Sequence, residues 1–213
     1  MIFSLLRERL STAVVGDVLD KLGLLHQFLP PQIQPLRDDM VLAGRAMPVV
    51  EEDGADEGRP FGLMLEALDD LKQGEVYLAA GGSPSYAMWG ELMSTRALKL
   101  GAAGAVLDGY SRDTAGILRL GFPVFSLGRY AQDQRPRGRV TEFRVPITIG
   151  QVRIAPGDII FGDADGVVVI PQAAEREVVT LALEKVEKEA VVRTAIERDG
   201  AGVVEAFRRY GVM

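Results

Sequence analysis

Short apolar runs of strand length alternate with stretches of helical spacing through the middle of the chain. The apolar runs are residues 76–80, 105–107 and 123–125, and helical periodicity fills residues 89–100 and 114–120 between them. This alternation is typical of a parallel sheet, because parallel neighbours must be joined by a crossover that is usually a helix. The sequence therefore predicts an α/β fold whose middle strands are parallel.

The flanking segments predict further elements. Helical spacing favours a short helix over residues 12–22 and a long, charged helix over residues 172–198. Between residues 140 and 170, short apolar runs are separated by turn-forming glycine, proline and aspartate, which favours antiparallel strands. Residues 51–60 are acidic and contain glycine, so we interpret them as an exposed loop. No linker separates two self-sufficient halves, and we therefore expect residues 1–213 to form a single domain.

Composition excludes several classes of site. The chain has 24 Lys and Arg against 30 Asp and Glu, and this net charge of −6 lacks the basic excess of a phosphate-backbone binder, so we expect no direct nucleic-acid binding. With no cysteine and one histidine, thiolate and histidine-rich metal sites are excluded, and any metal must be held by oxygen ligands. Arg7 cuts short the apolar start of the chain, which predicts neither an export signal nor a membrane span, and we expect a cytoplasmic protein.

An arginine and an aspartate directly follow one of the predicted strands. Arg112 and Asp113 lie in a glycine-containing turn after residues 105–107, and a second glycine-rich loop, residues 81–83, follows the predicted strand 76–80. Ligands of open α/β sheets settle beyond the carboxyl ends of the strands. We therefore expect the two loops to border one binding crevice.

The segment that begins at Gly90 lies between these loops and adds possible anion donors. A helix that starts near Trp89 would offer the backbone N–H groups of Leu92 and Met93 to a carboxylate. Arg112 could add a bidentate, charge-assisted contact to the same group. These residues predict a pocket for a small carboxylic acid.

Asp113 suits a different task, the binding of a hard divalent cation. Mg²⁺ is often held by one or two carboxylates, with waters completing its octahedron, and Glu91 could hold one of those waters. The alternative interpretation is that Arg112 and Asp113 are solvated charges in a turn. Periodicity alone leaves these two interpretations about equally supported.

Several motifs recur in an order that is typical of one protein family. They are Leu10-Ser11-Thr12-Ala13, Asp17-Val18-Leu19-Asp20, Ala43-Gly44-Arg45-Ala46, Trp89-Gly90-Glu91-Leu92, Gly101-Ala102-Ala103-Gly104, Arg112-Asp113 and Gly162-Asp163-Ala164-Asp165-Gly166. On these residues the chain resembles the RraA-like family, which includes 4-hydroxy-4-methyl-2-oxoglutarate/4-carboxy-4-hydroxy-2-oxoadipate aldolases and regulators of ribonuclease E. The resemblance covers about residues 10–171, and the motifs are specific jointly more than singly.

The resemblance implies a fold and an assembly. Family members have an αββα sandwich related to swivelling β/β/α domains and form homotrimers or homohexamers. The resemblance therefore implies that the long helix over residues 172–198 packs on a neighbouring subunit. It also implies that a glutamate of that helix approaches the neighbour's site, and Glu189 is the residue we select for this role.

The resemblance further implies roles for the site residues. Asp113 would be the ligand of Mg²⁺ or Mn²⁺, and Arg112 would contact pyruvate together with backbone amides from Gly90, Leu92 and Met93. In the same comparison, Glu91 matches the acidic residue that holds a metal-bound water.

The activity implied is that of a divalent-metal-dependent class II aldolase, which cleaves a 4-hydroxy-2-oxo diacid to pyruvate, with oxaloacetate decarboxylation as a second reaction. One departure stands against it. Active aldolases commonly carry an acidic residue three positions after the aspartate, where this chain has Gly116. The alternative function is that of a non-catalytic protein that binds and regulates a ribonuclease E-like enzyme.

Overall fold

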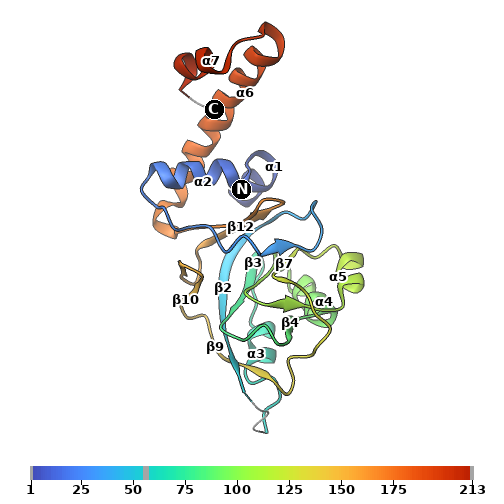
Figure 1. Cartoon of the computed structure of the whole chain (residues 1–213). Coiled ribbons are helices and arrows are strands. Elements are labelled where there is room, and N and C mark those ends of the chain that lie inside the picture. The colour runs from blue at the N-terminus through green and yellow to red at the C-terminus, as the bar shows by residue number, and fades with distance from the viewer. Residues whose placement is uncertain (1, 55–57, 212–213) are drawn as a thin grey trace.

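A mixed β-sheet of eight strands forms the centre of the fold (Figure 1), in a computed structural model that describes residues 2–54 and 58–211. The order is β1-β7-β5-β3-β2-β12-β13, and β9 also pairs with β2. The strands are β1 (Gln34–Pro35), β2 (Leu42–Asp53), β3 (Glu75–Ala80), β5 (Gly104–Leu107), β7 (Val124–Ser126), β9 (Gly138–Phe143), β12 (Ile159–Asp163) and β13 (Gly166–Ile170). The neighbours β2, β3, β5 and β7 are parallel, whereas β9, β12 and β13 pair antiparallel, which confirms both predictions.

Helices cover both faces of the sheet. The helices α3 (Met64–Asp69), α4 (Glu91–Leu100) and α5 (Thr114–Leu120) pack their apolar side chains into one core, which also takes in the hairpin of β10 (Ile147–Ile149) and β11 (Val152–Ile154). A second core lies between the sheet and the helices α1 (Ile2–Arg9), α2 (Thr12–Lys21) and α6 (Glu175–Asp199). The two cores make the fold an α/β sandwich, as expected.

The long charged helix is present and is preceded by a 3₁₀ turn, Gln172–Ala174. It projects from the body of the molecule and is followed by α7 (Val203–Tyr210), which periodicity did not predict (Figure 1). No helix within the described residues is long and apolar enough to cross a membrane.

The prediction of an exposed loop over residues 51–60 is wrong for its first residues. Residues 51–53 continue β2 and pair with β9, and the side chain of Glu51 is buried, whereas those of Glu52 and Asp53 are exposed as expected. The acidic composition of residues 51–60 indicated a loop, but the pairing with β9 keeps residues 51–53 in the strand. Residues 55–57 of that loop lie outside the described residues.

Candidate active site

A small parallel sheet of three short strands positions the candidate residues. It consists of β4 (Ala87–Trp89), β6 (Tyr110–Ser111) and β8 (Gly128–Arg129). Trp89 is paired with Ser111, and Ser111 with Arg129. The backbone N–H of Arg112 donates to the carbonyl oxygen of Trp89 at 2.9 Å. The chain therefore brings Gly90 and the Arg112–Asp113 pair side by side.

Trp89 and Gly90 fix the start of α4. The Trp89 side chain is buried, stacks on Phe122 at 6.1 Å and donates from Nε1 to Ser94 Oγ at 2.7 Å. Strand β4 ends at Trp89, and α4 begins at Glu91, two residues after the predicted start near Trp89. Leu92 and Met93 are the second and third residues of α4, and their N–H groups have no acceptor within the helix.

Asp113 has an unusual backbone conformation. It lies in the left-handed region, with φ 58° and ψ 33°, at the residue preceding α5. Aspartate tolerates this region better than most residues. Its Oδ2 accepts a hydrogen bond from the Glu91 N–H at 3.3 Å and lies 3.9 Å from Arg112 Nε. The side chain is 48% exposed, so its oxygens remain accessible to a ligand.

Gly90 is needed for this arrangement. A Cβ atom at position 90 would lie 2.7 Å from Asp113 Oδ2, closer than ordinary contacts allow. Any larger residue there would displace the carboxylate.

Asp133 is a site residue that the sequence analysis missed. Its Oδ1 lies 3.2 Å from Arg112 Nη2 and orients the guanidinium. A backbone hydrogen bond from Ala87 N to Gln132 O, 2.8 Å long, ties its loop to β4. Asp133 is twenty positions from Asp113 and follows no strand-end glycine, so only the three-dimensional structure reveals this pairing.

A buried carboxyl group lies under the same loop. Gln134 donates a hydrogen bond from Nε2 to Glu51, and the Glu51 side chain is almost fully buried. Burial raises the pKa of Glu51 to about 8, against the hydrogen bond from Gln134, which lowers it. The group is therefore mostly protonated at neutral pH.

Arg112 and Asp113 border a cavity of about 260 Å³. Its wall combines apolar side chains from α3 and β4 with the site residues, and comprises Phe61, Met64, Leu65, Leu68, Ala87, Met88, Trp89, Gly90, Leu92, Met93, Arg112, Asp113, Asp133 and Gln134. The cavity thus brings together Gly90, Leu92, Met93, Arg112 and Asp113, whereas residues 81–83 are not among its lining residues. The roles of these residues in binding and catalysis stay predictions.

The carboxyl group of Glu91 packs against Gly116. A Cβ atom at position 116 would lie 2.1 Å from the Glu91 carboxyl carbon, so the space that a side chain would fill is taken by Glu91. Arg119 Nη2 is 3.5 Å from Glu91 Oε1. The absence of a side chain at Gly116 therefore accommodates the Glu91 carboxylate between α4 and α5.

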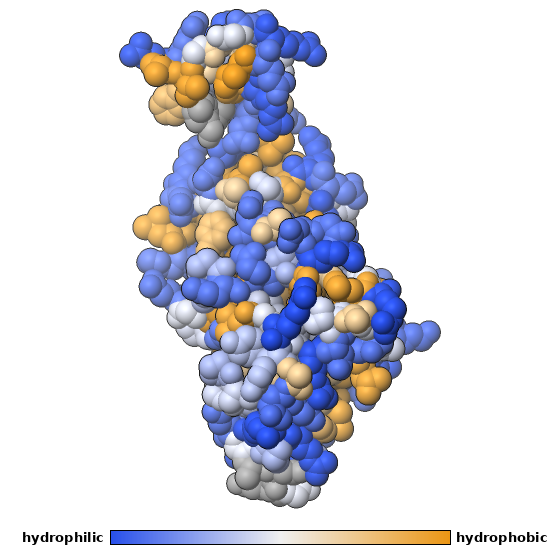
Figure 2. Space-filling view, turned by 45° about the vertical axis from the view of Figure 1, so that its right-hand side comes forward, coloured by the Kyte–Doolittle hydropathy of each residue, from blue (hydrophilic) through white to orange (hydrophobic). Residues whose placement is uncertain are grey.

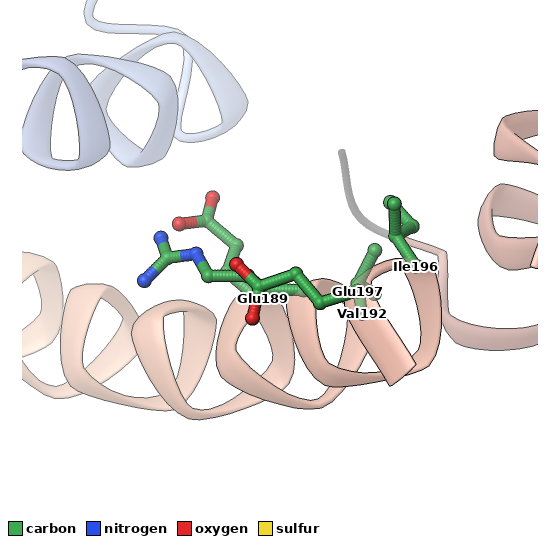
Figure 3. A pocket seen from close by; sticks show the side chains of 5 residues that line it. Glu189, Val192, Ile196 and Glu197 are labelled. Atoms are coloured by element: carbon green, nitrogen blue, oxygen red, sulfur yellow. The ribbon is translucent and has the colours of Figure 1, made fainter. Parts of the chain in front are cut away.

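Glu189 does not join this cluster within the chain. It lies on α6, where Lys185 Nζ is 2.7 Å from its Oε1. A hollow of about 360 Å³ beside it is lined by residues of α6 alone (Figure 3). In Figure 1, α6 rises on the side of the sheet away from α4 and α5. The role of Glu189 from a neighbouring subunit stays a prediction.

The donor set fits a cation that keeps much of its water. In the residues that the structure describes, no three histidine, cysteine, aspartate or glutamate side chains group to cage a metal ion. Asp113 offers one accessible carboxylate beside a cavity. That arrangement suits Mg²⁺ or Mn²⁺, which is often bound through one or two carboxylates, waters and ligand oxygens.

Comparisons with known proteins place this fold in a family. The family model described as "RraA-like: Aldolase/RraA" matches residues 12–169. A protein of Halalkalibacterium halodurans, provisionally named a 4-hydroxy-4-methyl-2-oxoglutarate aldolase, is 34% identical over 200 residues, which cover 93% of this chain and 89% of that protein.

Two solved structures extend the comparison. An uncharacterised protein of Pseudomonas syringae superposes with a TM-score of 0.87 at 30% identity, over 98% of this chain and 93% of that one. Streptomyces coelicolor RraAS2, described as an unusual member of the RNase ES inhibitor RraA family, superposes with a TM-score of 0.81 at 24% identity, over 90% and 95%. The second likeness supports the fold alone. Together with the family match, these likenesses show that the chain belongs to the RraA-like family.

Proposed function

We propose that this protein is a divalent-metal-dependent aldolase that cleaves a 4-hydroxy-2-oxo diacid and releases pyruvate, and that it also decarboxylates oxaloacetate. The observation that carries the proposal is the half-exposed Asp113 carboxylate beside Arg112, at a cavity that the first turn of α4 also lines. The likeness to proteins named as aldolases supports the same reaction class.

Arg112 and the start of α4 would bind the carboxylate of the 2-oxo acid. The guanidinium uses Nη2 for Asp133 and turns Nε toward Asp113, which leaves Nη1 for a substrate oxygen. The N–H groups of Leu92 and Met93 would donate to the same carboxylate. Asp133 keeps the arginine in place between substrate and Asp113.

Asp113 would hold the cation, and Glu91 would hold a water near it. When bound, Mg²⁺ or Mn²⁺ supplies Lewis-acid stabilisation to the negative charge that develops on the keto oxygen. In the cleavage, the electron pair of the C3–C4 bond stays on the pyruvate half, which then takes up a proton at C3. The C4 hydroxyl loses its proton and becomes a carbonyl, and we assign the proton to the Glu91 carboxylate, relayed through the water that Glu91 would hold.

Oxaloacetate decarboxylation needs less from the site. After CO₂ leaves, the electron pair of the broken bond stays on C3, as it does in the aldol cleavage. No hydroxyl proton has to be removed. We therefore expect this reaction to depend on Asp113 and Arg112 and to depend only weakly on Glu91.

We further propose that the protein acts in the cytoplasm as a homotrimer or homohexamer and does not bind nucleic acid directly. In that assembly α6 would pack on a neighbouring subunit and bring its Glu189 toward the site. The projection of α6 from the body supports this arrangement (Figure 1).

The test is pyruvate release from oxaloacetate and from 4-hydroxy-4-methyl-2-oxoglutarate with Mg²⁺, Mn²⁺ or EDTA, corrected for the rate without enzyme. Asp113→Asn tolerates the left-handed backbone and removes the charge. Because a Lewis acid contributes several kcal/mol, the rate should fall by about 100-fold or more.

Asp165→Asn is the matched control, because Asp165 is an exposed acid in the turn between β12 and β13. Wild-type rates in Asp113→Asn, or rates insensitive to EDTA, would remove Asp113 from the mechanism. An absence of any metal-dependent turnover would favour the alternative, a protein-binding regulator with a vestigial site.

A further inference from the structure

Arg112 and Asp113 also border a second cavity of about 260 Å³. Its other lining residues are Ser111, Thr114, Arg129, Tyr130 and Ala131. The two cavities share Arg112 and Asp113 and no other lining residue. A ligand held at that pair therefore has space to extend in a second direction.

Arg129 is the additional charged residue of the second cavity. It is exposed, and Nη2 donates to the carbonyl oxygen of Leu36 at 3.1 Å. No ion pair joins it to another residue within 2–54 and 58–211, in contrast to Arg112, which pairs with Asp133, and Arg119, which pairs with Glu91. An arginine has five N–H donors, and the hydrogen bond to Leu36 uses one donor of Arg129. The charged guanidinium therefore keeps donors for a ligand.

The backbone holds this side chain close to the candidate catalytic pair. Arg129 is the last residue of β8 and lies opposite Ser111 of β6, the residue before Arg112. Tyr130 packs edge-on against Tyr110, with ring centroids 5.7 Å apart, and forms a firm wall beside it. Arg129 thus adds a second positively charged side chain to the cavity, beside the Arg112–Asp113 pair.

We propose that Arg129 binds the distal carboxylate of the substrate and so makes the enzyme selective for 2-oxo diacids over 2-oxo monoacids. This inference rests on the proposed function, which places the 2-oxo acid end at Arg112, Leu92 and Met93. The carbon chain then passes Asp113 and the second carboxylate enters the cavity at Arg129. A guanidinium fork matches a carboxylate bidentately.

Size and charge agree with a small dianion. A cavity of about 260 Å³ lies below the range of about 300–1,000 Å³ that holds drug-sized ligands. Arg112 and Arg129 outnumber Asp113 among the charged lining residues, although the whole chain carries a net charge of −6. Asp133 balances the charge of Arg112 from outside this lining, so Arg129 supplies the positive charge that favours an anion here.

The test compares two ligands of equal chain length by calorimetric titration in the presence of Mg²⁺. 2-Oxoglutarate and 2-oxopentanoate share a five-carbon 2-oxo acid and differ in a terminal carboxylate against a methyl group. Wild type should bind 2-oxoglutarate about 10-fold to 100-fold more tightly, as one charge-assisted contact implies. In Arg129→Gln this ratio should fall close to one, and Arg129→Lys should restore part of it.

Pyruvate serves as the internal control because it has no distal carboxylate. Its affinity should be the same in wild type and Arg129→Gln, which also shows that the variant is folded. Arg153→Gln, an exposed arginine of β11 that lines neither cavity, should keep the full diacid preference.

Three outcomes overturn the proposal, and they are distinguishable. Equal wild-type affinity for the two five-carbon acids, or a preference that persists in Arg129→Gln, overturns the role of Arg129 while normal pyruvate binding leaves the proposed function intact. Failure of wild type to bind pyruvate with Mg²⁺ overturns the proposed function and this inference together.

Discussion

Glu51 is a carboxyl group that folding moves out of water. In the unfolded chain its pKa is near 4.5, and burial raises it to about 8 in the folded protein, with Gln134 as its hydrogen-bond partner. Between these two values the unfolded chain releases a proton that the folded protein retains. The contribution of protonated Glu51 to the free energy of unfolding is therefore complete below pH 4.5 and is lost as the pH rises through about 8.

Glu51→Gln should change this pH dependence. The amide is uncharged at every pH and can still accept the hydrogen bond from Gln134. Each tenfold change in a proton-binding constant is worth about 1.4 kcal/mol, so the free energy of unfolding should gain several kcal/mol on wild type between pH 5 and pH 8. Denaturant titrations at both pH values measure this gain. A difference between the two proteins that does not change with pH would contradict the assignment.

At the scale of elements, α5 shows how the chain accommodates Glu91. Gly116 lies inside this short helix, where glycine costs up to about 1 kcal/mol relative to alanine. The atoms that a Cβ would meet belong to the flexible end of the Glu91 side chain, which can move aside. The helix therefore gives up stability at Gly116 and gains a defined position for Glu91.

Gly116→Ala separates these two effects. We expect the variant to be more stable by up to about 1 kcal/mol, because the backbone has no positive φ at this position and the displaced atoms are a side-chain end. Aldol cleavage should fall severalfold, and oxaloacetate decarboxylation should change little. Thermal unfolding and the two pyruvate-release assays measure both. Loss of stability, or an equal loss of both activities, would contradict this account of Gly116.

The alternating elements in the middle of the chain could be predicted from the sequence, whereas the strands of the small sheet could not. The apolar runs of β3, β5 and β7 could be recognised because they alternate with the helical spacing of α4 and α5. Strands β4, β6 and β8 have two or three residues each and show no repeat. Arg112 and Asp113 could be predicted to lie at a crevice because they follow a predicted strand. The contact of Arg112 with Asp133 could not, because it depends on a distant loop that periodicity does not place.

At the scale of the whole molecule, the projecting helices carry apolar surface. Val203 and Val204 of α7 are 53% and 65% exposed, and Val191 of α6 is 50% exposed. Figure 2 shows apolar side chains gathered over the helices at the top of the molecule. Clustered apolar side chains at a surface are typical of protein contacts. With the assembly proposed above, this face would be covered by another copy of the chain.

Val204→Glu should weaken that assembly. A carboxylate placed between packed apolar side chains would be buried without a partner, which costs several kcal/mol in an interface. Light scattering should give a multiple of the 23.1 kDa chain mass for wild type and a smaller mass for the variant at equal concentration. Glu205→Gln, on the same helix and exposed, should keep the wild-type mass. If Glu189 reaches a neighbour's site, pyruvate release should fall together with the mass, and a variant that is fully active as a monomer would exclude Glu189 from catalysis.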